Sequence, residues 1–199
     1  MVIFNVPQQS PEWFSARLGI PSASNFDKII TTSGAPSKQA QKYMYRLAGE
    51  YVSGIPEESY QSAAMLRGIE LEPEARSLYE IIMDTPVIQA GFCMNEEPKY
   101  GCSVDGFVGD DGIVEIKCLS LSVHVEYLLG GLLPTEFFTQ VQGQLLVTGR
   151  KWNDLILYYP AIKPLIVRVV RDEEFIGKLK AVLEDFCEQL QQTIKKIGD

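Results

Sequence analysis

Apolar residues recur three and four positions apart in the first part of the chain and again at its end, which predicts helices in both regions. Ser10, Pro11 and Glu12 form a typical helix start. At Glu72-Pro73 the pattern restarts after a break near Gly68, with the proline in a first helical turn and Glu72 at or near the cap. The predicted helices cover residues 10–19, 21–30, 37–54, a stretch after the turn GIPEES at 54–59, 72–83 and 172–196.

Strand composition replaces this pattern in the middle of the chain. The segments PVIQAGFCM (86–94), KYGCSVDGFV (99–108) and GIVEIKCL (112–119) read as strands. Helices follow at 121–129 and 135–148, and the last predicted strands are DLILYY (154–159) and PLIVRVV (164–170). This order predicts the α/β class, as an α+β mixed sheet flanked by helices. No repeat or linker divides the 199 residues, so we expect a single domain over residues 1–199.

Composition is that of an ordinary soluble protein, with 46% hydrophobic and 22% charged residues. No apolar run reaches the ~18 residues needed to span a bilayer, and the start MVIFNVPQQSPEW lacks the features of a signal peptide. We therefore expect a cytoplasmic protein with no membrane contact. The net charge of −8 argues against a protein that coats DNA by neutralising phosphates, but it is compatible with an acidic metal site beside local basic groups.

Cysteine and histidine counts narrow the possible chemistry. The four cysteines form no C-x-x-C pair, so we expect reduced structural thiols and no zinc site. His124 is the only histidine, which excludes multi-histidine zinc sites and leaves little room for Ser-His-Asp catalysis. A metal ion would have to be held by carboxylates, which favours Mg²⁺ or Mn²⁺.

The stretch SVDGFVGDDGIVEIKC at 103–118 predicts a β-hairpin with charged side chains among apolar ones. Because side chains alternate along a strand, Glu115 and Lys117 share one face, opposite the apolar face that we expect in the core. Asp105, on the preceding strand, can lie across from them. One interpretation is a surface ion pair on an amphipathic hairpin, which would contribute little to stability.

The other interpretation is a metal-dependent nuclease site. Two carboxylates on adjacent strands can chelate a divalent ion and so produce a nucleophilic water. A nearby lysine can then stabilise the charge that builds on a reacting phosphate. This is the layout of the PD-(D/E)XK nucleases, the restriction-endonuclease-like core, with Val104 in place of the usual proline.

Four motifs in order resemble the lambda-exonuclease (YqaJ-type) family of viral recombination exonucleases. They are RLGIPSAS at 17–24, RGIELEPEARSLYE at 67–80, CSVDG followed by EIKC in the hairpin, and TQVQGQLLVTG at 139–149. The resemblance covers roughly residues 10–195.

The resemblance implies a role for each matched residue. Asp105, Glu115 and the Ile116 carbonyl would hold the metal, and Lys117 would be the catalytic lysine. The remaining roles fall to Glu72, which would position the attacking water, to Gln140, which would hydrogen-bond within the site, and to Arg17 and Ser24, which would receive the DNA 5′-phosphate.

Each of these residues also has a structural interpretation. Glu72 and Arg76 could form an i,i+4 pair on a helix. Arg17 could be a surface cation and Ser24 a helix cap. Gln140 and Gln142 point to different sides of a helix, so at most one of them is expected to reach the site.

The function implied by the resemblance is that of a Mg²⁺-dependent 5′→3′ exonuclease, in which Mn²⁺ can substitute. It would degrade one strand of linear double-stranded DNA to 5′-mononucleotides and leave a 3′ single strand. The family also implies a homotrimer ring, a single-strand annealing partner and a phage or prophage origin in a bacterial host. The alternatives are a restriction- or resolvase-like endonuclease with the same hairpin, and a catalytically silent module that binds a protein.

Overall fold

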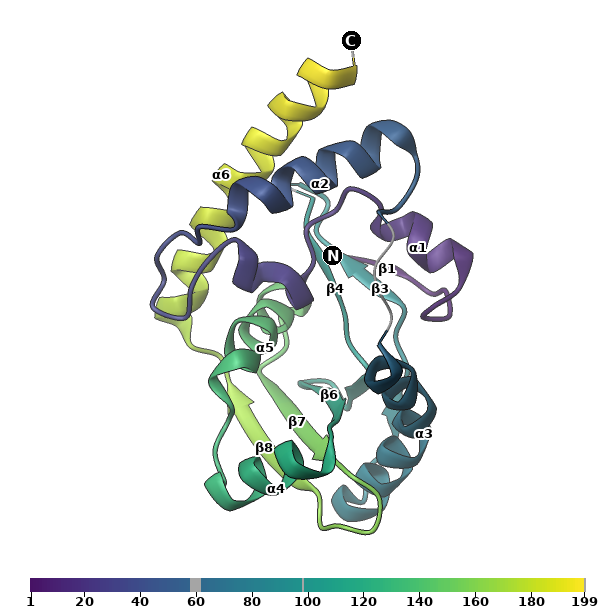
Figure 1. Ribbon diagram of the computed structural model, residues 1–199. Coiled ribbons are helices and arrows are strands. Elements are labelled where there is room, and N and C mark those ends of the chain that lie inside the picture. The colour runs from purple at the N-terminus through teal and green to yellow at the C-terminus, as the bar shows by residue number, and fades with distance from the viewer. Residues whose placement is uncertain (58–61, 98, 199) are drawn as a thin grey trace.

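The computed structural model describes residues 1–57, 62–97 and 99–198, and its strands form two sheets (Figure 1). The larger sheet has five strands in the order β2-β5-β6-β7-β8, and the smaller has three in the order β1-β3-β4. The strands are β1 (Val2–Phe4), β2 (Val87–Ile88), β3 (Phe92–Met94), β4 (Gly101–Ser103), β5 (Gly106–Val108), β6 (Gly112–Cys118), β7 (Trp152–Tyr158) and β8 (Leu165–Val170).

Helices surround these sheets. They are α1 (Pro11–Arg17), the 3-10 helix η1 (Ala23–Lys28), α2 (Ala40–Ser53), α3 (Ala63–Met83), α4 (Leu121–Gly130), α5 (Thr135–Thr148) and α6 (Glu173–Gly198). None of the helices in the described residues is long and apolar enough to cross a membrane. The predicted mixed sheet flanked by helices is confirmed.

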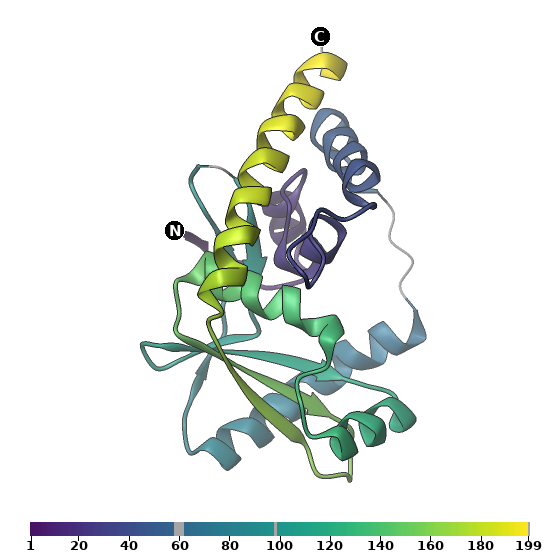
Figure 2. The ribbon, with the colours of Figure 1, turned by 90° about the vertical axis from the view of Figure 1, so that its left-hand side faces the viewer.

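The larger sheet combines both strand directions. Strands β6 and β7 run parallel, whereas the β2–β5, β5–β6 and β7–β8 pairs are antiparallel. A parallel pair requires a crossover, and α4 and α5 supply it. Helix α3 covers one face of the sheet and α5 the other (Figure 2), so that β6 is covered on both sides.

The main core lies between α5, η1, α2 and α6. The apolar stripe of α6 is buried as expected, and α6 packs along α2 (Figures 1 and 2). Helix α5 approaches η1 so closely that a Cβ at Gly143 would lie 2.5 Å from Phe26 Cδ2. The glycine thus allows η1, which carries Ser24, to rest against the helix that carries Gln140.

Helix α3 differs from the prediction, because it is continuous where a break near Gly68 and a restart at Glu72-Pro73 were expected. Ser62 caps it by accepting a hydrogen bond from the Met65 N–H at 3.2 Å, and Gly68 and Pro73 both lie inside it. Glu72 is therefore near the middle of a 21-residue helix and not at a cap. Part of the turn predicted at 54–59 lies outside the described residues.

Local predictions were also wrong at four other places. Residues 21–30 contain a six-residue 3-10 helix in place of an α-helix, and the helix predicted from residue 37 begins at Ala40, with Gln39 as its cap. The expected strand 86–94 divides into β2 and β3, and 99–108 divides into β4 and β5. In both cases the halves join different sheets, a partition set by non-local pairing that a single strand pattern does not reveal.

Candidate active site

Asp105 lies at the junction between the two sheets. It follows β4 of the small sheet and precedes β5, whose first residue, Gly106, pairs with Val114. Past that pair, no strand of the described residues pairs with β6 on this side, and Asp105 Oδ2 accepts the Ile116 N–H at 2.6 Å. Because the N–H and C=O of a strand residue point to the same neighbour, the Ile116 carbonyl is directed to the side of Asp105.

Glu115 is buried, with 4% of its surface exposed, so the interpretation as a surface ion pair is wrong. Its Oε1 accepts from Gln140 Nε2 at 2.5 Å and pairs with Lys117 Nζ at 2.7 Å. Gln140 Oε1 in turn accepts from Lys117 Nζ at 3.1 Å. We call Asp105, Glu115, Lys117 and Gln140 the carboxylate–lysine cluster. The face of β6 that carries it is covered by α5, whereas the expectation was that only the apolar face would be buried.

Burial and mutual repulsion shape the electrostatics of this cluster. Burial raises the pKa of Asp105 well above its ordinary value, and the charges of Glu115 and Glu72 raise it further. Burial alone would lower the pKa of Lys117, but the carboxylates of Glu115 and Asp105 outweigh it and leave that pKa raised. The lysine is therefore held as a cation beside carboxylates that repel one another.

This donor set fits a hard divalent cation. Two carboxylates and a backbone carbonyl supply only oxygen ligands, and a cation between them would offset the repulsion that raises the pKa of Asp105. No group of three or more His, Cys, Asp or Glu side chains suited to a metal occurs in the part of the chain that the structure describes. Any ion here would thus depend on the Ile116 carbonyl and on water for its remaining ligands.

Glu72 reaches the same region from α3. It forms an i,i+4 ion pair with Arg76, as the structural interpretation expected, and it also lines the cavity beside Lys117. Burial raises its pKa, Arg76 opposes that shift, and Glu115 adds to it. The dipole of a helix start does not act on Glu72, because Glu72 is in mid-helix.

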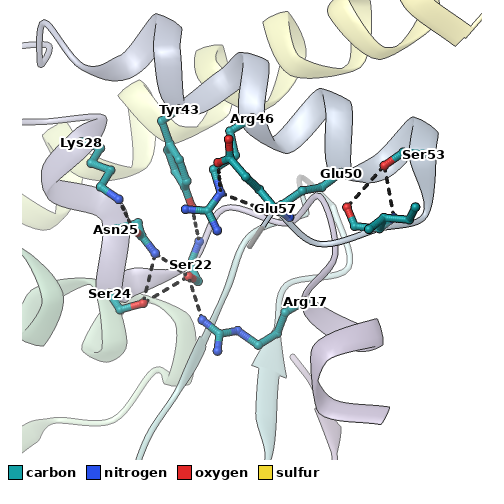
Figure 3. Close-up of polar contacts among 11 residues, drawn as sticks. Arg17, Ser22, Ser24, Asn25, Lys28, Tyr43, Arg46, Glu50, Ser53 and Glu57 are labelled. Carbon is teal, nitrogen blue, oxygen red and sulfur yellow. Dashed lines mark hydrogen bonds and ion pairs between the residues drawn. The ribbon is translucent and has the colours of Figure 1, made fainter. Parts of the chain in front are cut away.

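Arg17 and Ser24 lie in a second polar group (Figure 3). Arg17 Nη2 donates to Ser22 Oγ at 3.3 Å, and the hydroxyl oxygens of Ser22 and Ser24 are 3.3 Å apart. We call Arg17, Ser22 and Ser24 the arginine–serine group. The Arg17 guanidinium stacks on Trp13 at 3.8 Å, and burial lowers its pKa to about 10. Arg17 is thus a half-buried cation and not a solvated one. Ser24 is exposed inside a short 3-10 helix and does not cap it.

Further polar side chains surround this group, and sequence reasoning missed them. The Tyr43 hydroxyl accepts from the Ser22 N–H at 3.4 Å, and Lys28 Nζ donates to Asn25 Oδ1 at 2.6 Å. Arg46 pairs with Glu50 at 2.9 Å and with Glu57 at 3.2 Å. Asn25 follows the motif RLGIPSAS directly and could have been noticed, whereas Tyr43 and Arg46 come from α2 and carry no local signal.

One cavity of about 930 Å³ joins the two regions. Its lining includes Arg17 and Ser24 at one end and Glu72, Ile116 and Lys117 at the other. Ser103 links them within the fold, because its hydroxyl accepts from Trp13 Nε1 at 2.9 Å and its carbonyl accepts from Gln144 Nε2 at 3.0 Å.

The glutamines of α5 separate as expected. Gln140 reaches the carboxylate–lysine cluster, whereas Gln142 turns away, donating to the Val170 carbonyl at 2.9 Å and accepting from the Asp172 N–H at 2.9 Å. Gln144 was not predicted, yet its Nε2 donates to Glu115 Oε2 at 2.5 Å. Its spacing of four residues from Gln140 places both on one helix face and was the available signal.

A mixed sheet places two carboxylates beside a lysine that lines the same cavity as an arginine, the arrangement expected of a nuclease. Residues 12–151 match the YqaJ-like viral recombinase domain, and the chain belongs to that family. No match is found among curated proteins.

Solved structures agree with this assignment. An alkaline exonuclease from Laribacter hongkongensis, LHK-Exo, is 33% identical, with 94% of this chain and 96% of that chain covered and a TM-score of 0.86. Its complex with dAMP gives the same TM-score of 0.86. A phage related exonuclease from Haemophilus somnus 129PT, 17% identical over 89% of this chain and 96% of that chain, shares the fold with a TM-score of 0.71. The chain is thus a DNA exonuclease of the phage recombination type with a lambda-exonuclease-like fold.

Proposed function

We propose that this chain is a Mg²⁺-dependent 5′→3′ exonuclease, in which Mn²⁺ can replace Mg²⁺, acting on linear double-stranded DNA. It would release 5′-mononucleotides and leave a 3′ single strand. The observation that carries the proposal is the single cavity lined by Arg17 and Ser24 as well as by Glu72, Ile116 and Lys117. A strand end bound at the arginine would place a phosphodiester bond near the lysine.

In this proposal the carboxylate–lysine cluster performs cleavage. Asp105, Glu115 and the Ile116 carbonyl would hold the ion, which when bound supplies a nucleophilic water and neutralises phosphate charge. Lys117 would stabilise the charge that develops on the reacting phosphate. Glu72 would orient the attacking water through a hydrogen bond, and Gln140 holds Glu115 and Lys117 in a fixed relation through bonds to both.

The arginine–serine group would select the strand end. A guanidinium can bind a terminal phosphate in a bidentate manner, and the Ser24 hydroxyl, exposed to the cavity, can add a further hydrogen bond. Arg17 is stacked on Trp13 and is therefore already oriented before a ligand arrives.

The relatives support the remaining parts of the proposal. The structure of LHK-Exo with dAMP shows a relative that binds a 5′-mononucleotide, the product proposed here. A viral recombinase family is consistent with a phage or prophage enzyme that works in the bacterial cytoplasm with a single-strand annealing protein. We propose further that the enzyme is a homotrimer whose subunits each form a single domain over residues 1–199.

Two samples of a linear duplex test this function, one labelled at its 5′ end and the other at its 3′ end. With Mg²⁺, the 5′ label should appear first as a mononucleotide, and the 3′ label should stay on a long single strand. With EDTA, both labels should stay on the intact duplex. Closed circular duplex should remain intact. Cutting of closed circles would favour the endonuclease alternative, and no cleavage of any substrate would favour the silent module.

A further inference from the structure

Gln144 is fully buried, with 0% of its surface exposed, and both its amide nitrogen and its amide oxygen form hydrogen bonds. Its Nε2 donates to Glu115 Oε2 at 2.5 Å and to the Ser103 carbonyl at 3.0 Å. Its Oε1 accepts from Asn153 Nδ2 at 2.8 Å. A primary amide has two N–H donors, and both are directed at groups that flank the proposed metal site.

Three contacts hold the Gln144 amide in one orientation. The Glu115 carboxylate and the Ser103 carbonyl can only accept, so the Gln144 nitrogen must face them, and Asn153, buried on β7, donates to the Gln144 oxygen. In the opposite orientation the Gln144 oxygen would meet the acceptor oxygens of Glu115 and Ser103. Reversal is therefore unfavourable in this interior, because it would leave buried polar groups unpaired.

The two groups that accept from Gln144 lie on β6, which carries Glu115, and at the end of β4, shortly before Asp105. Glu115 is on β6 of the large sheet, and Ser103 ends β4 of the small sheet, two residues before Asp105. One amide thus connects the strand segment of one carboxylate to the side chain of the other. Their separation and the rotation of the Glu115 carboxylate both depend on that amide.

We propose that Gln144, with its oxygen held by Asn153, is a positioning residue that sets the geometry of Glu115 relative to Asp105 and thereby the affinity for the divalent ion. This inference rests on the proposed function, because it requires Glu115 and Asp105 to be metal ligands. Groups that orient metal ligands commonly change metal affinity by about 10–100-fold when they are removed.

Gln144→Met tests the proposal, since methionine has a similar length and no amide. Titration calorimetry with Mn²⁺ on the folded protein should show binding weakened by about 10–100-fold. Asn153→Leu leaves Gln144 in place but removes the donor that holds its amide oxygen, and it should weaken binding several-fold. The matched control is Gln142→Met. Gln142 is a buried glutamine of the same helix, and its side chain bonds to the backbone of Val170 and Asp172.

The control separates positioning from stability. Gln142→Met should lower the melting temperature in EDTA while leaving Mn²⁺ affinity unchanged, whereas both site variants should lose affinity beyond any shared loss of stability. If Gln144→Met does not fold, Asn153→Leu decides the question. Wild-type affinity in folded Asn153→Leu, or equal losses in all three variants, would overturn the proposal. Failure of the wild-type protein to bind Mn²⁺ would instead overturn the metal assignment itself.

Discussion

Lys117 of the carboxylate–lysine cluster lines the same cavity as the arginine–serine group, but the two groups are built differently. Hydrogen bonds and ion pairs that hold the cluster are between 2.5 and 3.1 Å long, and they come from α5, β6 and the junction between the sheets. In the arginine–serine group the hydrogen bonds of the Ser22 and Ser24 hydroxyls are 3.3–3.5 Å long (Figure 3).

This difference corresponds to the two tasks that we propose for these groups. Cleavage depends on charged groups that are already in position when charge develops on the phosphate, and a tightly bonded, buried cluster provides that. End recognition depends on groups that exchange weak internal contacts for bonds to a ligand. Because the contacts around the Arg17 guanidinium, which stacks on Trp13, are long, that exchange costs little free energy.

The largest effect is expected from Lys117→Ala. Loss of a charge that stabilises the reacting phosphate reduces the rate by about 10²–10³-fold, while Glu115 keeps its bonds to Gln140 and Gln144 and the fold persists. Single-turnover cleavage and a thermal melt measure the two parts. Lys151→Ala, which removes an exposed lysine paired with Asp111 at 2.9 Å, is the control and should cleave normally. Wild-type turnover in Lys117→Ala would refute the catalytic assignment.

The second largest effect is expected on metal affinity. Asp105→Ala and Glu115→Ala should each weaken Mn²⁺ binding at least about tenfold, and the double variant should lose less than the sum of the two free-energy changes, because both serve one ion. Calorimetric titration of the three variants and of Asp111→Ala, an exposed control, gives the comparison. Fully additive losses, or unchanged affinity in both single variants, would contradict a shared site.

Replacing the Asp105 carboxylate should stabilise the fold while it lowers activity. Its pKa is raised in the folded state, so the ionised carboxylate destabilises the metal-free fold as the pH rises above the unfolded value of 3.8. Asp105→Asn should therefore raise the melting temperature in EDTA at pH 7.5 by a few degrees, at about 2–4 °C per kcal/mol. The gain should shrink as the pH falls toward 4, and Mg²⁺ should stabilise only the wild type. A lower melting temperature for Asp105→Asn in EDTA would show that the carboxylate is not under repulsion.

Sequence patterns predicted the elements of the carboxylate–lysine cluster well. Strand alternation placed Glu115 and Lys117 together, and helical spacing separated Gln140 from Gln142. The mixed sheet followed from the order of the elements. These features depend on neighbours in the chain, for which periodicity is informative.

Features that depend on distant pairing were not predictable in the same way. The division of 99–108 between two sheets, which places Asp105 at their junction, follows from how β3 and β6 pair with the segment. Asn153 faces Gln144 only because β7 lies parallel to β6 in one particular register. Helix α3 continues through Pro73 because packing of residues such as Tyr79 on the sheet outweighs the local tendency to break.

The direct test of the division of tasks is the response of Arg17→Ala to the chemistry of the DNA end. A charge-assisted contact with a terminal phosphate contributes about 1.5–3 kcal/mol, so wild-type enzyme should prefer 5′-phosphorylated over 5′-hydroxyl ends by ~10-fold or more. Arg17→Ala should slow on phosphorylated ends alone and lose that preference. Arg150→Ala, which removes an arginine that bonds to the Gly109 carbonyl, should keep it. Equal slowing of Arg17→Ala on both kinds of end would contradict the account, because Arg17 would then be a general backbone contact.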